Sequence, residues 1–376
     1  MKYKLSDICH YRKGKVDVSL LTDDTYISTE NMIPNRGGIT KAATLPTVDS
    51  TQLYKKGDVL VSNIRPYFKK IWQATCDGGC SNDVLVFQAN EGFDQDYLYY
   101  VLSDDAFFAY AMKTSKGTKM PRGDKHSIMQ YETEVCDLDT QRKIASLLKS
   151  IDGKIELNNA INNNLEQQAA EMVRKYCDNT LSYVELGTIL SFDNGFAFQS
   201  SSYRTKGKYR IITIKNVQDG KIDSQGCACI NDIPPRMKKE CILSIGDVLL
   251  SLTGNVGRVG IVCERDLLLN QRVAKFVPYD IRLLPLLYFY FRLPSTKASL
   301  ETISKGTAQQ NLSPIETLQL KIPFEAQKAI ELSDSLTPMF DIICQKNIEN
   351  IQLANILNSI LPRLMSRELD ISDIEL

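Results

Sequence analysis

The pattern of apolar and polar positions occurs twice along the chain, with the second copy beginning near the middle. In each copy, short runs rich in β-branched residues precede a segment with a helical pattern. The strand-like runs include 58–62, 84–87 and 211–214, and the helical segments are 97–102 and 286–291. A repeat of this length decides the architecture. It predicts an α+β chain in which two mixed α/β modules are related by a pseudo-twofold axis.

Short motifs recur in the same order in both copies, which shows how the copies align. Segments 27–31, 57–62 and 115–118 return as 212–216, 246–251 and 304–307, and Tyr3, Leu5, Ile8 and Gly14 return as Tyr183, Leu186, Ile189 and Gly195. The Gly-Asp pair that opens the second motif is typical of a turn into a strand. We therefore place the modules at 1–136 and 181–324, followed by periodic stretches at 137–180 and 325–376.

Both periodic stretches carry apolar residues at alternating spacings of three and four, the pattern of a coiled-coil seam. Asn162 and Asn347 fall on the same core position of this seam, one in each copy. A core asparagine lowers stability but fixes the register of paired helices. We predict that two long helices form an antiparallel coiled coil within the chain, with Asn162 and Asn347 near their crossing point. The alternative is that each helix packs on its own module and that both asparagines are solvated.

Two prolines interrupt the second stretch, whereas the first stretch has none. Because proline lacks a backbone N–H and clashes with the preceding turn, we expect the second helix to begin after Pro338 and to kink or fray near Pro362. The first helix should run without a break from Ile144 to Tyr176, a length of about 50 Å at the rise of an α-helix. A rod of this length can hold two modules at a fixed separation.

The bulk composition limits the class of protein. With 376 residues and an apolar fraction of 43%, the chain fits two globular domains plus connecting helices. No run is long enough to cross a membrane and the first residues contain no apolar signal segment, so we expect no membrane association. The ten cysteines do not recur between the copies, and only His10 and His126 could join them in a metal site. We therefore expect reduced cysteines, no metal centre and a cytoplasmic location.

The sequence motifs of common enzymes are missing. Segment 254–260 is rich in glycine but lacks the lysine and the following helix of a phosphate-binding loop. The two histidines do not correspond between the copies, so a duplicated acid-base site built on histidine is excluded. Carboxylates form no paired cluster that repeats. We expect no catalytic residue, and the remaining function is binding.

The net charge is zero, with 45 basic and 45 acidic residues, but the charges are sorted along the chain. The second module holds 18 basic against 12 acidic residues, whereas the final stretch holds 4 against 9. Such sorting is expected where some faces meet phosphate and others meet protein.

Two loops of the first module combine cations with small or aromatic residues. In one of them, lysines alternate with glycine, so that ammonium and backbone N–H groups can reach phosphates while Arg122 reaches a guanine edge. The matching segment of the second module, 304–311, carries glutamine and asparagine instead, and these amides pair with adenine. The alternative is an ordinary solvated surface loop in each module. A shared framework with different side chains favours two modules that recognise different DNA half-sites.

The candidate DNA-contacting residues fall in two pairs of equivalent loops. They are Lys116, Gly117, Thr118, Lys119, Arg122 and Lys125 with the counterparts Lys305, Gly306, Thr307, Gln309 and Gln310, and Lys55, Arg65, Tyr67 and Lys69 with the counterparts Asn255, Arg258, Gln271 and Arg272. Half-sites on one face of B-DNA lie about 34–36 Å apart, and the helical rod is long enough to impose that spacing.

With these motifs in this order, the chain resembles the specificity subunit of type I restriction–modification systems over essentially its whole length. The resemblance rests on Gly-Asp-Val-Leu-x-Ser at 57–62 and 246–251, on Ser-Lys-Gly-Thr at 115–118 and 304–307, and on Gly-Thr-Lys-Met-Pro-Arg-Gly at 117–123. It implies that the two modules are target-recognition domains and that the two periodic stretches are conserved spacer helices.

The resemblance also implies a function and partners. The chain would have no catalytic site or cofactor of its own and would bind double-stranded DNA at a bipartite site, with one half for each recognition domain and the helix pair as the ruler. It would dock two methyltransferase subunits, which restriction–translocase subunits would join. S-adenosylmethionine, ATP and magnesium would belong to those partners. Two alternatives stay open: a DNA methyltransferase or nuclease that acts alone, and a coiled-coil scaffold that binds no DNA.

Overall fold

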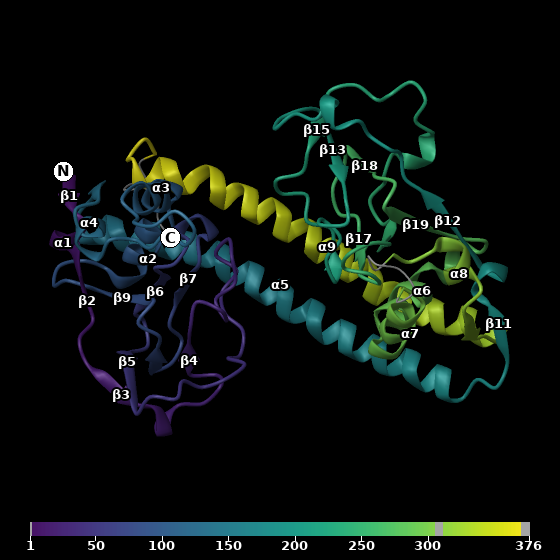
Figure 1. Cartoon of the computed structure of the whole chain (residues 1–376), viewed down its shortest axis with the longest axis horizontal. Helices are drawn as coiled ribbons and strands as arrows, with labels where there is room; N and C mark the ends of the chain where they lie inside the picture. Colours follow the sequence, from purple (N-terminus) through teal and green to yellow (C-terminus); the bar gives the residue numbers. More distant parts are fainter. Residues whose placement is uncertain (1, 305–310, 370–376) are drawn as a thin grey trace. The chain divides into compact units, whose positions relative to one another are not determined.

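The computed structural model describes residues 2–304 and 311–369, which form two compact units. Unit 1 contains Met1–Lys154 and Leu353–Leu376, and unit 2 contains Ile155–Gln352. Two long helices, α5 (Leu138–Asp178) and α9 (Ala326–Met365), contribute to both units (Figure 1). Within the described ranges, none of the helices combines the length and the apolar character needed to traverse a bilayer.

Unit 1 is a mixed α/β unit with ten short strands and four helices of its own within its described residues. Its strands are β1 (Lys2–Lys4), β2 (Cys9–Tyr11), β3 (Lys15–Asp17), β4 (Tyr26–Ile27), β5 (Ser50–Tyr54), β6 (Val59–Ser62), β7 (Ile71–Gln73), β8 (Gly78–Cys80), β9 (Val84–Ala89) and β10 (Glu132–Glu134). Its helices are α1 (Leu5–Ile8), α2 (Gln95–Ser103), α3 (Asp105–Lys113) and α4 (Lys125–Ile128). One sheet has the order β2-β9-β6-β7 and a second has the order β3-β5-β8-β4, while β1 pairs with β10.

The central strand β6 is buried on both faces, and this explains its unbroken apolar run. Val59 and Val61 pack with α2, α3 and the segments of α5 and α9 that belong to unit 1. Leu60 points to the opposite face and packs with residues of the second sheet, including Tyr54. Positions 59–61 therefore join two hydrophobic clusters through one strand.

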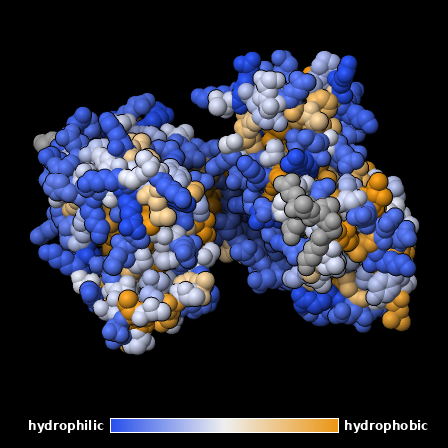
Figure 2. Space-filling model, in the orientation of Figure 1, coloured by the Kyte–Doolittle hydropathy of each residue, from blue (hydrophilic) through white to orange (hydrophobic). Residues whose placement is uncertain are grey.

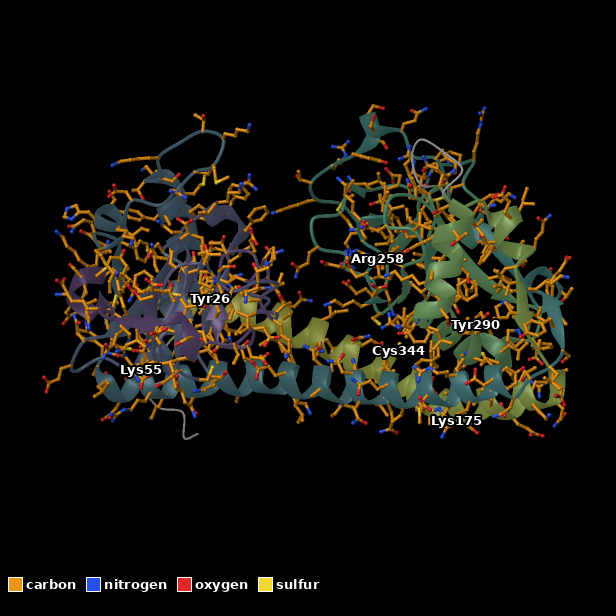
Figure 3. The ribbon with its side chains drawn as sticks, turned by 60° about the horizontal axis from the view of Figure 1, so that its bottom comes forward. Tyr26, Lys55, Lys175, Arg258, Tyr290 and Cys344 are labelled. Carbon is orange, nitrogen blue, oxygen red and sulfur yellow. The ribbon has the colours of Figure 1, made fainter. Side chains whose placement is uncertain are left out.

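Unit 2 repeats this arrangement. Its strands are β11 (Tyr183–Glu185), β12 (Leu190–Asn194), β13 (Tyr209–Ile212), β14 (Gly220–Lys221), β15 (Cys229–Ile230), β16 (Val248–Ser251), β17 (Val259–Ile261), β18 (Leu267–Leu269), β19 (Val273–Pro278) and β20 (Lys321–Pro323). Its helices are α6 (Leu284–Arg292), α7 (Pro294–Ser304) and α8 (Pro314–Leu318). The sheets have the orders β12-β19-β16-β17-β14 and β15-β13-β18, and β11 pairs with β20. Tyr290 of α6 and Cys344 of α9, both labelled in Figure 3, belong to one hydrophobic cluster and its packed surround.

The strand registers confirm the internal duplication residue by residue. Leu60 pairs with Val86 across β6 and β9, and Leu249 pairs with Lys275 across β16 and β19, so both partners shift by the same number of positions. The register also corrects one detail of the motif alignment. Tyr3 lies opposite Thr133, and its equivalent by register is Val184 opposite Ile322, one position beyond Tyr183.

The repeated Ser/Thr-x-x-Asn motif forms the same turn in both units. Asn31 Oδ1 accepts a hydrogen bond from the backbone amide of Ser28 at 2.6 Å, and Asn216 Oδ1 accepts from that of Thr213 at 2.9 Å. In the Gly-Asp motif, the carboxylates of Asp58 and Asp247 each accept from a backbone amide three residues earlier. The glycines before Asp58 and Asp247 have a φ of +92°, and the Gly-Asp turns are therefore as predicted.

The helices α5 and α9 contact each other through asparagines, and the two on α5 are buried. Within unit 2, Asn162 Nδ2 donates to Asn347 Oδ1 at 3.0 Å, and Asn158 Nδ2 donates to Asn350 Oδ1 at 2.9 Å. The helices are antiparallel, because higher numbers on α5 pair with lower numbers on α9. Asn162 is only 7% exposed. The predicted register contact is confirmed, and the alternative with solvated asparagines is wrong.

The expected start of the second helix after Pro338 is wrong, because α9 begins at Ala326 and continues to Met365. Pro338 and Pro362 are both exposed, so water can solvate the carbonyl groups that each proline leaves without a helical partner. Buried Leu336 and Phe340 flank Pro338 in the core of unit 2. Their packing outweighs a local cost of about 3 kcal/mol for an interior proline.

The asparagine pair gives a direct test of the helix register. We expect Asn162→Ala and Asn347→Ala each to lower the free energy of unfolding, because each removes the hydrogen bond between the two side chains, and Asn347→Ala also leaves the buried amide of Asn162 without its partner. The double variant should lose less than the sum of the two, with a coupling energy of about 1 kcal/mol in urea denaturation. Asn163→Ala, one residue away on the exposed face, is the matched control and should change stability by less than about 0.5 kcal/mol. Zero coupling would contradict the pairing.

Candidate nucleic-acid interface

In unit 1, three chain segments meet beyond the end of β6. The backbone amide of Asn63 donates to the carbonyl of Asp83 at 2.8 Å, and the amide of Gly123 donates to the carbonyl of Asn63 at 3.0 Å. Lys116 and Arg122 exchange two backbone hydrogen bonds of 2.8 and 2.9 Å, which closes the hairpin 116–122. These bonds hold the hairpin beyond the end of β6, and residues 116–120 are exposed. We call the two backbone hydrogen bonds that join residue 63 to residues 83 and 123 the ladder.

Unit 2 has the same ladder at the positions that the strand register makes equivalent. The amide of Leu252 donates to the carbonyl of Arg272 at 3.1 Å, and the amide of Leu312 donates to the carbonyl of Leu252 at 2.6 Å. A bridge between Thr253 and Asn311 matches the one between Ile64 and Arg122. Asp83 is therefore equivalent to Arg272, and Arg122 is equivalent to Asn311.

The loop after β6 carries two cations in a conformation that favours glycine. Arg65 and Lys69 both have a φ of +50°, and the equivalent loop of unit 2 has Gly254 at +75° and Gly257 at +79°. A left-handed backbone costs a residue with a side chain about 1–2 kcal/mol. Arg65 Nε is also buried without a hydrogen-bond partner among the described residues. Unit 1 thus keeps Arg65 and Lys69 at an energetic cost, which is typical of functional sites.

Most cations around the unit 1 ladder have an acidic neighbour. Nitrogen-to-oxygen distances are 3.2 Å for Arg122 and Asp83, 2.7 Å for Lys116 and Asp124, and 2.9 Å for Lys69 and Asp105. The Lys116 ammonium, followed by the Ser127 amide, holds the pKa of Asp124 well below its usual value. Exposed ion pairs of this kind contribute at most about 1 kcal/mol. They do not prevent the cations from binding phosphate.

The structure does not bring Lys55 to the ladder. Lys55 lies in the turn before β6 and its ammonium is 2.8 Å from Asp77, whereas Arg65, Tyr67 and Lys69 follow the other end of that strand. The hydrogen bond from Lys55 lowers the pKa of Asp77. Of the remaining candidates, Tyr67 is 49% exposed, Gly117 has a φ of +91° and Lys125 begins α4. Thr118 and Lys119 are exposed in the hairpin.

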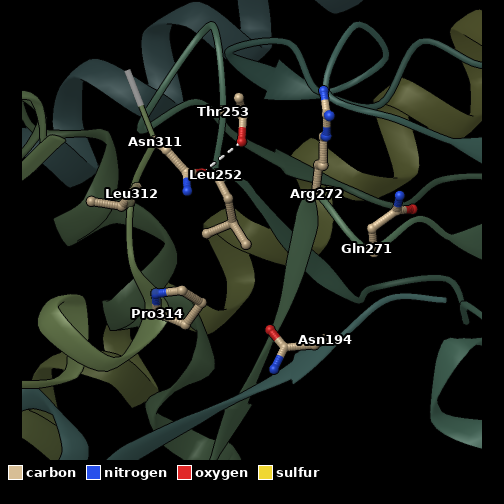
Figure 4. Close-up of a pocket in the computed structure, with 8 residues that line it drawn as sticks. All are labelled: Asn194, Leu252, Thr253, Gln271, Arg272, Asn311, Leu312 and Pro314. Carbon is tan, nitrogen blue, oxygen red and sulfur yellow. Dashed lines mark hydrogen bonds between the residues drawn. The ribbon is translucent and has the colours of Figure 1, made fainter. Parts of the chain in front are cut away.

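In unit 2, the ladder borders a polar pocket of about 460 Å³ (Figure 4). Its lining includes Gln271, Arg272, Thr253, Asn311 and Asn194. Thr253 Oγ1 donates to Asn311 Oδ1 at 2.8 Å, and Figure 4 shows the amide nitrogen of Asn311 directed away from Thr253.

The other unit 2 candidates differ in their surroundings. Asn255 is exposed, while Arg258, labelled in Figure 3, donates to the side chain of Gln218 at 2.8 Å. The candidates Lys305, Gly306, Thr307, Gln309 and Gln310 lie outside the described residues.

Asp83, Thr253 and Asn194 lie beside the candidate residues in the structure but were not among the residues that the sequence suggested. Asp83 belongs to no repeated motif. When the Gly-Asp motifs of the two copies are aligned, however, Asp83 corresponds to Arg272, which was a candidate. Thr253 and Asn194 gave no signal, since their role depends on packing between segments far apart in the chain.

The surface of the molecule and the state of its cysteines were also compared with what the sequence suggested. The face shown in Figure 2 is mainly hydrophilic, with apolar residues in small separate patches. None of the ten cysteines forms a disulfide. Among residues 2–304 and 311–369, no three histidine, cysteine or acidic side chains come close enough together to hold a metal ion.

Comparisons with known proteins place the chain in a family. The family model described as type I restriction modification DNA specificity domain matches residues 1–167 and 180–352. The type I restriction enzyme HindI specificity subunit of Haemophilus influenzae is 26% identical over 185 residues, which cover 46% of this chain and 40% of that protein. The crystal structure of a type I restriction-modification system S subunit from M. genitalium superposes with a TM-score of 0.58 at 16% identity, over 99% of this chain and 96% of that one, which shows the shared fold. This chain therefore belongs to the type I restriction modification DNA specificity family, with two copies of the family's domain.

Proposed function

We propose that the chain is the sequence-specific DNA-binding subunit of a type I restriction–modification complex, and that each unit reads one half of a bipartite target. The ladder is the observation that supports this proposal. The same backbone hydrogen bonds hold positions 122 and 311 at the surface, but one is an arginine and the other is an asparagine. Two identical binding functions would not require different side chains at equivalent positions.

Arginine and asparagine are side chains that read base edges. Arginine donates two hydrogen bonds to guanine, and asparagine exchanges two with adenine. The exposed lysines beside Arg122 supply contacts to phosphate, which position a protein on DNA without reading its sequence. The interface that we propose contains Arg65, Tyr67, Lys69 and the hairpin 116–122 in unit 1, and Asn255, Gln271, Arg272 and Asn311 in unit 2. Lys55 does not belong to it, because it lies at the other end of β6.

The helix pair has two roles in this proposal. The 41 residues of α5 correspond to about 60 Å of continuous helix, which is longer than one turn of B-DNA. We propose that the pair sets the spacing of the half-sites and that its exposed faces dock two methyltransferase subunits, which restriction–translocase subunits join. S-adenosylmethionine, ATP and magnesium then belong to those partners, and this chain catalyses no step. A chain that methylated DNA without partners, with labelled S-adenosylmethionine, would contradict this assignment.

The salt dependence of DNA binding separates this function from that of a protein-only scaffold. Each phosphate contact lowers the slope of log affinity against log salt by about 0.9. For the chain in complex with methyltransferase subunits, we expect a slope steeper than that of the methyltransferase subunits alone. Equal slopes for the two samples would favour the scaffold.

Arg65→Gly separates the strain of the unit 1 loop from its function. Glycine removes the left-handed strain and Arg65's buried Nε, so the free energy of unfolding should stay the same or rise by about 1 kcal/mol. DNA affinity of the complex should fall, because a cation of the interface is lost. Lys55→Ala, which removes a cation far from the ladder, is the matched control and should leave affinity unchanged. Equal affinity for wild type and Arg65→Gly would remove Arg65 from the interface.

A further inference from the structure

The two ladders carry side chains of different charge at equivalent backbone positions. In unit 1, Asp83 and Arg122 occupy the two outer segments, so an anion faces a cation. In unit 2, the equivalent positions carry Arg272 and Asn311, so a cation faces a neutral amide. The backbone bonds beneath them are the same. The difference therefore lies in the chemistry that each ladder presents to a ligand.

In unit 1, the side chains of Asp83 and Arg122 stand side by side and remain accessible. Arg122 Nη2 is 3.2 Å from Asp83 Oδ2, and the two side chains are 57% and 34% exposed, with the larger value for Arg122. One contact uses only part of their capacity, since a guanidinium has five N–H donors and a carboxylate accepts about four hydrogen bonds. Asp83 also lines a polar cavity of about 410 Å³ together with Glu30 and Ser81. The pair thus offers donors and acceptors at one place.

A G·C base pair has the complementary pattern. In the major groove, guanine presents the acceptors N7 and O6, and cytosine presents the N4 amino group as a donor. Arginine matches the guanine edge and a carboxylate matches the cytosine amino group. An A·T pair lacks this match, because adenine places a donor where guanine has O6. A side-by-side Arg122 and Asp83 can therefore read both bases of one G·C pair.

In unit 2, Thr253 restrains the amide of Asn311. Its hydroxyl donates to Asn311 Oδ1, which leaves one lone pair of the oxygen as an acceptor, and among residues 2–304 and 311–369 the amide nitrogen donates to no other group. A donor and an acceptor on one planar amide match N7 and the N6 amino group of adenine. Unit 1 has Ile64 at the position of Thr253, so it lacks this hydrogen bond. Within the described residues, Arg272 has no ion pair, and its charge is available to a phosphate or a base acceptor.

From these contacts we infer that residues 83 and 122 of unit 1 and residues 253 and 311 of unit 2 determine base specificity. Asp83 and Arg122 select a G·C pair, and Asn311, oriented by Thr253, selects an A·T pair at the equivalent place of the other half-site. This inference rests on the proposed function. It adds the identity of the base pair and assigns Asp83 as a reader and Thr253 as a positioning residue.

The test uses the complex of the full chain with its methyltransferase subunits. Its affinity is measured for DNA duplexes in which each base pair of the target is replaced in turn. For the wild type, the position read by unit 1 should be a G·C pair, and replacement should cost between about 5-fold and 150-fold in affinity. Arg122→Ala and Asp83→Ala should each remove that preference at the same position and leave the other half-site unchanged. Asn311→Ala and Thr253→Val should do so for an A·T pair in the other half-site only.

A matched control separates base reading from phosphate binding. Lys119→Ala removes an exposed cation from the same hairpin and should weaken binding equally for all duplexes. If Arg122→Ala behaves like Lys119→Ala, or if Asp83→Ala leaves the preference intact, the inference is wrong while the proposed function stands. If the wild-type complex shows no base preference in any duplex, the proposed function itself fails. Arg122→Lys, which keeps the charge but loses the planar donor pair, should weaken the preference while retaining the salt slope.

Discussion

In each unit, two backbone hydrogen bonds determine which positions are exposed at the candidate interface. Residue 63 links the segment before β9 to the segment before α4, and residue 252 links the segment before β19 to the segment before α8. Both bonds use only main-chain atoms, so they tolerate any side chain at the outer positions. Buried strand β6, and its counterpart β16, fix the central residue of each ladder. A rigid frame with free outer positions allows the side chains to differ without a change of fold.

Stability and recognition are divided between different residues. The asparagine pair between α5 and α9 lies in a buried seam, where it specifies register at some cost in stability. Arg65 and Lys69 carry a second cost, because unit 2 has glycines where these residues adopt a left-handed backbone. The shared fold does not need this strain, because the other copy avoids it, and we propose that unit 1 retains it for contact with DNA. Each unit therefore holds its own surface chemistry on the same scaffold.

The sequence predicted the duplication, the long helices and the asparagine contact, because all three depend on periodic patterns that persist over many residues. It misjudged the start of α9, since packing of Leu336 and Phe340 outweighs the local effect of Pro338. It also joined Lys55 to Arg65 in one patch, although β6 separates them, because closeness in sequence does not give position on a sheet. Aligning the two copies would have pointed to Asp83, which falls on Arg272, whereas Thr253 became visible only when the structure placed distant segments side by side.

In the function that we propose, two units with one backbone frame read two different half-sites. The measurement is to select duplexes from a random pool with the chain in complex with its methyltransferase subunits and to sequence the duplexes that bind. We expect two separate blocks of enriched bases of different sequence, with a gap of fixed length between them. A single uninterrupted block, or bound duplexes with no base preference, would contradict the proposal.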